Sequence, residues 1–110
     1  MENKISVLIP TYKSIGALDL CLESCIKGCH NINNIEIIVG CDGTYNICKD
    51  VLDKYEKFIR WIYYEENVGL SIMTNTLVDE AKANYILIVN DDNVFPKDFD
   101  LDNDSGTVTT

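Results

Sequence analysis

Four short apolar runs alternate with three segments of helical spacing along this chain of 110 residues. The runs are rich in β-branched and aromatic residues and are bounded by polar turns, a pattern typical of buried β-strands. They occupy residues 5–9, 35–40, 58–64 and 85–89. We expect each of them to form a strand.

The three segments between the runs repeat apolar residues every three or four positions, as amphipathic helices do. The second helix is expected over residues 46–58 and the third over residues 71–83, with Ser71 as a candidate cap. The residues expected to face the core are Ile15, Leu18, Leu22, Cys25 and Cys29 in the first segment, Ile47, Val51 and Tyr55 in the second, and Ile72, Leu77 and Ala81 in the third.

The elements therefore follow one another in the order β-α-β-α-β-α-β. Near-continuous apolar strands joined by helices predict an α/β fold, with a mainly parallel four-stranded sheet and helices on both faces. We assign residues 1–99 to this domain and residues 100–110 to an acidic loop or tail.

Composition and charge narrow the class of protein. A hydrophobic content of 46% and a charged content of 25% are ordinary for a globular domain. The formal net charge of −9 disfavours a nucleic-acid partner, which requires clustered Lys and Arg. No apolar stretch reaches the length of a membrane span, no signal peptide is evident, and the odd number of cysteines argues against a closed set of disulfides. We expect a cytoplasmic protein with reduced thiols.

Polar residues follow each of the four runs. In a parallel sheet the carboxyl ends of the strands meet at one edge, where ligands of open α/β sheets bind. The residues expected at this edge are Pro10, Thr11 and Tyr12; Cys41, Asp42, Gly43 and Thr44; Glu65, Glu66, Asn67, Val68 and Gly69; and Asn90, Asp91 and Asp92. The edge is acidic, which favours a hard cation such as Mg²⁺ or Mn²⁺.

Asp91 and Asp92 stand at the end of the fourth run. Side chains of adjacent residues at a strand end point to opposite sides, so one carboxylate is expected to bind metal and the other to accept a hydrogen bond, for example from a ribose hydroxyl. A solvated turn is the alternative interpretation of the doublet. The glycine signatures of dinucleotide-binding and P-loop enzymes are absent, which disfavours both classes.

Two further clusters have simpler explanations than metal binding. Cys21, Cys25 and Cys29, which His30 follows directly, are spaced by four rather than as a zinc knuckle. We therefore interpret the thiols as small buried residues and place His30 near a helix end. Cys48 is likewise interpreted as a packing residue. The acidic residues at 100, 102 and 104 resemble a calcium loop, but a solvated tail is favoured.

Three segments, SVLIPTYKS, EIIVGCDGTYN and ENVGLSIMTNTLVDEAKANYILIVNDDNVFP, together resemble family 2 glycosyltransferases. The similarity covers the chain from Ile5 to about Phe99 and implies the Rossmann-like GT-A fold of the family's nucleotide-sugar-binding half. The implied function is binding of a nucleotide-sugar, most simply a UDP-sugar, through Mn²⁺ or Mg²⁺, for inverting sugar transfer to an unidentified carbohydrate or protein acceptor.

The resemblance also implies residue roles. Pro10, Thr11 and Tyr12 match the turn beside the nucleotide base, and Asp42 with Gly43 matches the acid that hydrogen-bonds the base. Asn67 and Gly69 match the family's Asn-x-Gly before the third helix, and Asn75 matches an asparagine within that helix. Asp92 matches the metal ligand, and Asp91 matches its neighbour at the ribose or sugar.

The chain departs from the family pattern at three positions. Cys41 stands in place of an Asp, Thr74 in place of an Arg, and Asn90 in place of the first acid of the metal motif. No residue matches the family's catalytic base, which follows the metal motif in the longer family domains, so none is nominated.

The short length of the chain relative to the family domains, together with the missing match to a base, leads to two expectations about the chain. The first is a donor-binding half from a truncated product, a fragment or a split enzyme, whose exposed fourth strand would favour self-association or a partner that supplies the missing half. The second is a non-catalytic nucleotide-sugar-binding or assembly module. A hydrolase with paired carboxylates and two metals is a third, weaker interpretation.

Overall fold

Four parallel strands form a single sheet in the order β3-β2-β1-β4. The structure is a computed structural model and describes residues 5–13, 15–29 and 32–95. The strands are β1 (Ile5–Thr11), β2 (Ile35–Asp42), β3 (Ile59–Tyr64) and β4 (Tyr85–Ile88). The predicted α/β class and parallel sheet are confirmed, and the strands begin within one residue of their expected positions.

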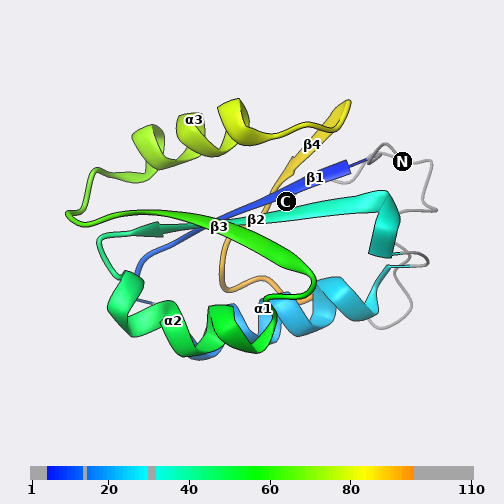
Figure 1. Cartoon of the computed structure of the whole chain (residues 1–110), viewed down its shortest axis with the longest axis horizontal. Coiled ribbons are helices and arrows are strands. Elements are labelled where there is room, and N and C mark those ends of the chain that lie inside the picture. Colours follow the sequence, from blue (N-terminus) through cyan, green and yellow to red (C-terminus); the bar gives the residue numbers. More distant parts are fainter. Residues whose placement is uncertain (1–4, 14, 30–31, 96–110) are drawn as a thin grey trace.

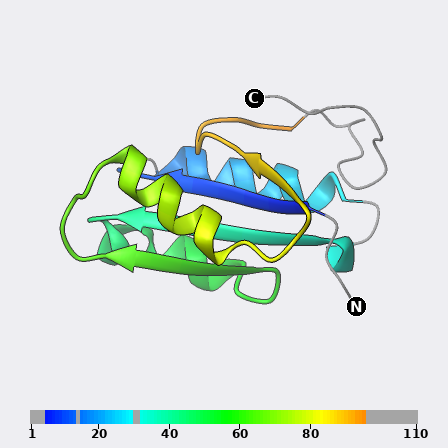
Figure 2. The same cartoon turned by 90° about the horizontal axis from the view of Figure 1, so that it is seen from above.

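In the described part of the chain, three helices cover the two faces of the sheet. Helices α1 (Ile15–Lys27) and α2 (Tyr45–Lys54) lie on one face, and α3 (Leu70–Glu80) lies on the other (Figure 1). Figure 2 shows α3 over the middle of the sheet, with β3 and β4 at its opposite edges. A short 3₁₀ turn, η1 (Ile32–Asn34), precedes β2 and was not predicted, because three residues carry no periodic signal.

The larger part of the core lies between the sheet and the α1–α2 layer. Alternate strand residues such as Val7, Ile9 and Val39 point to this face, because side chains along a strand alternate between its two sides. They meet Leu18 and Leu22 of α1, both fully buried. Cys21, Cys25 and Cys48 are also buried in this layer, as the sequence predicted.

The second part of the core is smaller and lies under α3. Met73 and Leu77 of that helix pack against Leu8 and Ile38 of the central strands. Gly40 allows this close approach, since a Cβ atom there would lie 2.5 Å from Met73 Sδ. The glycine therefore brings α3 down onto the sheet beside the carboxyl ends of the strands.

The predicted inward faces of α2 and α3 were wrong at two positions. Ile47 and Ile72 are 44% and 51% exposed, whereas their neighbours Cys48 and Met73 are fully buried. One residue rotates a helix face by about 100°, so apolar spacing leaves the phase open when adjacent residues are both apolar. Ser71 does not cap α3, because the helix begins at Leu70 and its N-cap is Gly69.

Charged and polar side chains close the amino end of the sheet. Glu36 accepts hydrogen bonds from Ser6 Oγ at 2.7 Å and from the Arg60 guanidinium at 3.1 Å. It also accepts the N–H of Lys82, while Ser6 Oγ accepts the N–H of Ala83. These contacts tie the segment between α3 and β4 to the two central strands.

The sheet opens between β1 and β4 at its carboxyl end. The ladder between them ends at the pair Leu8 and Ile88, and Val89 N–H still donates to Leu8 O. Pro10 lies two residues beyond Leu8 in β1 and faces the side from which β4 has diverged. Its missing N–H therefore costs no hydrogen bond to β4. In open α/β sheets the point where the strand order reverses is where ligands bind.

Several predictions concern residues outside the described ranges. They are the position of His30, the acidic loop or tail at residues 100–110 and its resemblance to a calcium loop.

Candidate functional site

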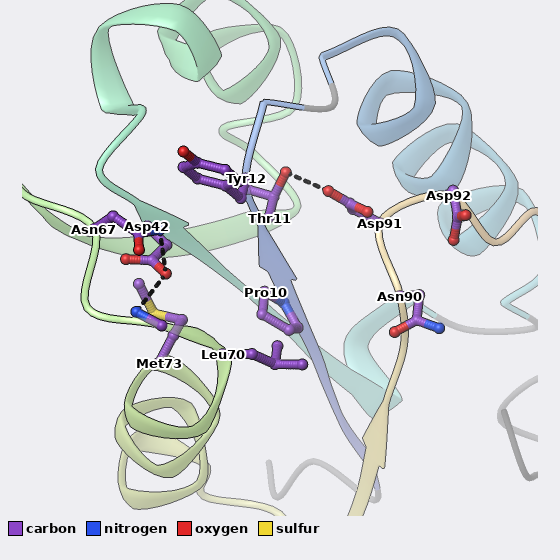
Figure 3. A pocket seen from close by; sticks show the side chains of 11 residues that line it. Pro10, Thr11, Tyr12, Asp42, Asn67, Leu70, Met73, Asn90, Asp91 and Asp92 are labelled. Carbon is purple, nitrogen blue, oxygen red and sulfur yellow. Dashed lines mark hydrogen bonds between the residues drawn. The ribbon is translucent and has the colours of Figure 1, made fainter.

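A crevice of about 530 Å³ lies at the carboxyl edge of the sheet (Figure 3). Its volume is in the range of small-molecule sites. The crevice is lined by residues from the ends of β1 and β2, from the start of α3 and from the segments after β3 and β4. They are Pro10, Thr11, Tyr12, Asp42, Asn67, Gly69, Leu70, Met73, Asn90, Asp91 and Asp92. The structure thus brings together the clusters that the sequence placed at one edge.

The carboxylate of Asp42 holds the segment that leads into α3. Its Oδ2 accepts hydrogen bonds from Asn67 Nδ2 at 3.0 Å and from Gly69 N at 2.9 Å. Its Oδ1 accepts Val68 N at 2.6 Å. Asp42 is 5% exposed, so these three donors replace much of the water that a carboxylate would otherwise bind.

Gly43 allows this segment to approach β2. Its φ is +77°, and a Cβ atom built there would lie 2.7 Å from the backbone nitrogen of Asn67. Its N–H donates to Tyr64 O at 3.0 Å. Gly43 does not line the crevice itself, but its lack of a side chain permits the contact between Asp42 and the 67–69 segment.

On the other side of the crevice, Thr11 connects the end of β1 to the turn after β4. Its Oγ1 donates a hydrogen bond of 2.7 Å to Asp91 Oδ2 (Figure 3). Asp91 therefore points toward β1, whereas the exposed Asp92 points away from Thr11. The two carboxylates diverge as adjacent residues were expected to do, although they lie in the turn after β4 rather than in the strand.

Tyr12 presents an aromatic ring at the rim. Tyr12 is 46% exposed, and the Lys13 ammonium lies 5.0 Å from the centroid of its ring. Lys13 has a φ of 60°, a left-handed conformation that few residues other than glycine and asparagine adopt. The chain bends at Tyr12 and Lys13, directly after β1 ends.

Sequence reasoning missed Leu70 and Met73, which give the crevice an apolar side. Leu70 was assigned to no element, and Met73 was not in the predicted inward face of its helix. Both residues follow closely after Gly69, which the sequence placed at the edge of the sheet, and this position could have indicated that they line the crevice. Asn75 lies on the exposed side of α3 and does not line the crevice.

A buried thiol lies behind the acidic turn. Cys21 Sγ donates a weak hydrogen bond to Asn90 O at 3.8 Å. Burial, together with the nearby charges of Asp91 and Asp92, raises the pKa of the Cys21 thiol to about 12. The thiol therefore stays neutral at physiological pH and does not act as an anionic ligand.

The fold has counterparts among solved structures. Staphylococcus aureus TarS, residues 1–349, crystallised with UDP-GlcNAc, superimposes with a TM-score of 0.79 at 25% identity over 86% of this chain and 28% of that one. The mannosyltransferase PcManGT of Pyrobaculum calidifontis, in complex with GDP-Man and Mn²⁺, gives a TM-score of 0.74 at 17% identity, over 89% of this chain and 30% of that one. Both resemblances support the GT-A type of α/β fold.

The sequence comparisons identify the family. The glycosyl transferase family 2 model matches residues 6–102, and the chain belongs to that family. Glycosyltransferase GlyA of Streptococcus pneumoniae is 31% identical over 90% of this chain, and the putative teichuronic acid biosynthesis glycosyltransferase TuaG of Bacillus subtilis is 28% identical over 86%. The chain spans 14% of the length of GlyA and 38% of TuaG. None of the helices in the described part is long and apolar enough to cross a membrane.

Proposed function

We propose that this domain binds the donor of a sugar-transfer reaction, a UDP-sugar, together with a divalent metal ion. The observation that carries the proposal is the convergence of Thr11, Asp42, Asn67 and Asp92 on one crevice, although they stand at or after the ends of four different strands. The structural likeness to TarS, which was crystallised with UDP-GlcNAc, supports the choice of donor.

The proposed orientation of the donor follows the chemistry of the lining. The base lies beside Pro10, Tyr12 and Asp42, where an aromatic ring and a buried carboxylate are adjacent. The ribose or the sugar lies near Asp91, whose Oδ2 is held by Thr11 and whose other oxygen can accept a hydroxyl donor. The diphosphate lies toward Asp92.

A metal ion is compatible with the residues present. The described lining holds three carboxylates, Asp42, Asp91 and Asp92, and no Lys, Arg or His, so the charged side chains that a diphosphate would meet there are all negative. Among the described residues no group of three or more His, Cys, Asp or Glu could hold an ion by itself. Mg²⁺ and its analogues are commonly bound by one or two carboxylates, waters and substrate phosphates, which suits the exposed Asp92.

The chemistry of the site is then charge stabilisation and orientation. A bound ion would stabilise the negative charge that grows on the diphosphate as the bond to the sugar breaks. The chain's own residues orient the donor: Thr11 fixes Asp91, and Asp42 fixes the loop of Asn67. We infer an inverting transfer, with the catalytic base supplied from outside the described residues.

Titration calorimetry tests the proposal directly. UDP should bind in MnCl₂ and bind at least about tenfold more weakly in EDTA, because the acidic lining repels the diphosphate when no cation is present. Asp92→Ala should abolish the metal dependence, whereas Asp79→Ala, on the exposed side of α3, should retain it. Nucleotide binding that is absent or independent of metal would refute the proposal.

Activity assays distinguish the enzyme from the two alternatives, the non-catalytic module and the hydrolase. Transfer of sugar, or slow hydrolysis of the UDP-sugar with Mn²⁺, would support a catalytic domain. Binding without turnover would favour the non-catalytic module. No feature of the described structure favours that module over the enzyme. Release of inorganic phosphate would favour the hydrolase.

A further inference from the structure

Two buried thiols from different elements meet beside the turn that follows β2. Cys41 and Val39 point to the same face of β2, because strand residues alternate between the two sides of a sheet, and α2 covers that face. Cys48 stands in the first turn of α2 and is fully buried in the same part of the core. The Cys41 and Cys48 thiols are close enough to share a hydrogen bond. They are therefore already neighbours in the reduced protein.

The surroundings make Cys48 the more reactive thiol of the pair. Thr44, the N-cap residue of α2, has its Oγ1 3.6 Å from Cys48 Sγ. The hydrogen bond with Cys41 lowers the pKa of the Cys48 thiol; burial opposes this shift, and Thr44 reinforces it. The same hydrogen bond, together with burial, raises the pKa of Cys41. Because a thiol reacts with oxidants as its thiolate, the reaction begins at Cys48.

The pair lies directly behind the crevice. Cys41 precedes Asp42 in the chain and is paired with Thr11 across the sheet, and both of these residues line the crevice. The charge of Asp91, on the same side of the crevice as Thr11, also acts on Cys48. A small neutral oxidant can reach such a pair through local opening of the first turn of a helix.

We propose that Cys41 and Cys48 form a reversible dithiol–disulfide site, which hydrogen peroxide oxidises and a dithiol reductant restores. The two cysteines come from the end of β2 and the start of α2, so the disulfide would join two elements rather than two turns of one helix. Cysteine at position 41 is one of the departures from the family pattern, and the site is therefore a feature of this chain.

The oxidation takes place in two steps. The Cys48 thiolate attacks one oxygen of the peroxide, so that an S–O bond forms and the O–O bond breaks. The departing hydroxide combines with the proton that Cys48 has given up and becomes water. The Cys41 sulfur then attacks the sulfenic sulfur of Cys48, the S–S bond forms, and the S–O bond breaks with release of a second water. The two thiols lose two electrons and two protons, and the peroxide is reduced to two waters.

Formation of the disulfide would move the turn between the two cysteines. A disulfide holds its sulfurs about 2.05 Å apart, closer than two separate thiols can approach, so the first turn of α2 must move toward the end of β2. Asp42 and Gly43 lie in this turn, and Gly43 already packs tightly against the Asn67 backbone. We therefore expect the disulfide to displace Asp42 and to weaken nucleotide binding, a consequence that rests on the proposed function.

Mass spectrometry of the whole chain tests the site itself. The reduced protein has five thiols; after treatment with hydrogen peroxide, alkylation of the unfolded chain should label two fewer, and dithiothreitol should restore all five. Cleavage before aspartate separates Cys41 from Cys48 at Asp42. The peptides that begin at Asp19 and at Asp42 should therefore stay joined until they are reduced.

Three variants locate the bond. Cys41→Ser and Cys48→Ser should each abolish the link between the two peptides. Cys29→Ser is the matched control, because Cys29 is a partly exposed thiol whose Sγ donates to Cys25 O, and serine can make the same hydrogen bond. It should keep the link. Should a serine variant fail to fold, the peptide link in the wild-type protein still decides the question.

Calorimetry with UDP in MnCl₂, after removal of the oxidant, measures the effect on the crevice. The oxidised wild-type protein should bind UDP at least about fivefold more weakly than the reduced protein, the lower end of the usual coupling between two sites. Dithiothreitol should restore the affinity. Cys48→Ser should bind UDP equally before and after oxidation. A loss caused by oxidation of Met73 would instead persist in dithiothreitol and would also appear in Cys48→Ser.

Two results would overturn the inference and leave the donor-binding proposal in place. Oxidation without a link between Cys41 and Cys48, including a link between other cysteines, would refute the site. Equal UDP affinity of the reduced and the linked protein would refute its effect on the crevice. Failure of UDP to bind the reduced protein in MnCl₂ would refute the proposed function, whereas mass spectrometry would still decide whether the disulfide forms.

Discussion

Thr11 Oγ1 and Asp91 Oδ2 are 2.7 Å apart, although 80 residues separate them in the sequence. The hydrogen bond joins the end of β1 to the turn after β4 across the point where the two strands diverge. It directs Asp91 away from Asp92 and so separates the two carboxylates of the turn (Figure 3). The acidic doublet is in this way divided into one tethered and one exposed group.

Thr11→Val tests the importance of this tether. Valine has nearly the shape of threonine but cannot donate, so Asp91 loses its partner at a cost of about 1 kcal/mol in the free energy of unfolding. Binding of UDP-sugar in MnCl₂ should weaken more than this change in stability suggests, because Asp91 is no longer oriented. Thr11→Ser keeps the hydroxyl and should bind nearly as the wild type does. Equal binding by the Val and Ser variants would show that the tether has no functional role.

Gly43→Ala should destabilise the protein by about 1–3 kcal/mol, since alanine strains the backbone at a φ of +77°. Its Cβ would also press on the Asn67 backbone at 2.7 Å. Urea unfolding measures the loss, and binding of UDP should weaken in parallel. Gly16→Ala is the control: nothing lies within 4 Å of a Cβ at this helical position, so alanine should be neutral or slightly stabilising. Similar behaviour of the two variants would contradict the contact proposed for Gly43.

Glu36 should make stability depend on pH. Burial alone would raise the pKa of Glu36, but hydrogen bonds from the Lys82 N–H, Ser6 and Arg60 outweigh it and hold the pKa below its ordinary value of 4.5. The stabilisation is therefore present above pH 4.5 and is lost as the pH falls through the lowered pKa.

Glu36→Gln should reduce the free energy of unfolding at pH 7 by about 1.5–3 kcal/mol, the contribution of hydrogen bonds to a charged group. It should also flatten the decline of stability in acid. Thermal unfolding between pH 3 and pH 7 measures both effects. Glu56→Gln, an exposed site, should behave as the wild type does, and a decline that persists unchanged in Glu36→Gln would place its origin elsewhere.

Leu77→Ala should remove about 2–5 kcal/mol, because the side chain is fully buried in the small core under α3. The same helix carries Leu70 and Met73 into the crevice, so nucleotide affinity should fall as well. Chemical denaturation and calorimetry follow the two effects. Val78→Ala, on the neighbouring and partly exposed position, should change stability by about 0.5 kcal/mol or less.

The sequence by itself determined the strands, their parallel arrangement and the edge at which their polar ends meet. Short β-branched runs separated by helical segments leave few other topologies, and a parallel sheet places every carboxyl end on the same side. For this reason the sequence alone assigns Thr11, Asp42, Asn67 and Asp92 to one edge of the sheet, where all four line the crevice.

Only the tertiary structure decided which atoms of these residues face one another. The sequence did not reveal that the Asp42 carboxylate is filled by the 67–69 segment, since that depends on the close approach at Gly43. The phase predicted for α3 from the sequence was also wrong at one position, because the packed helix exposes Ile72 and turns Met73 toward the crevice. Periodicity fixes which residues share a helix face, but the rotation of that face is set by what the helix packs against.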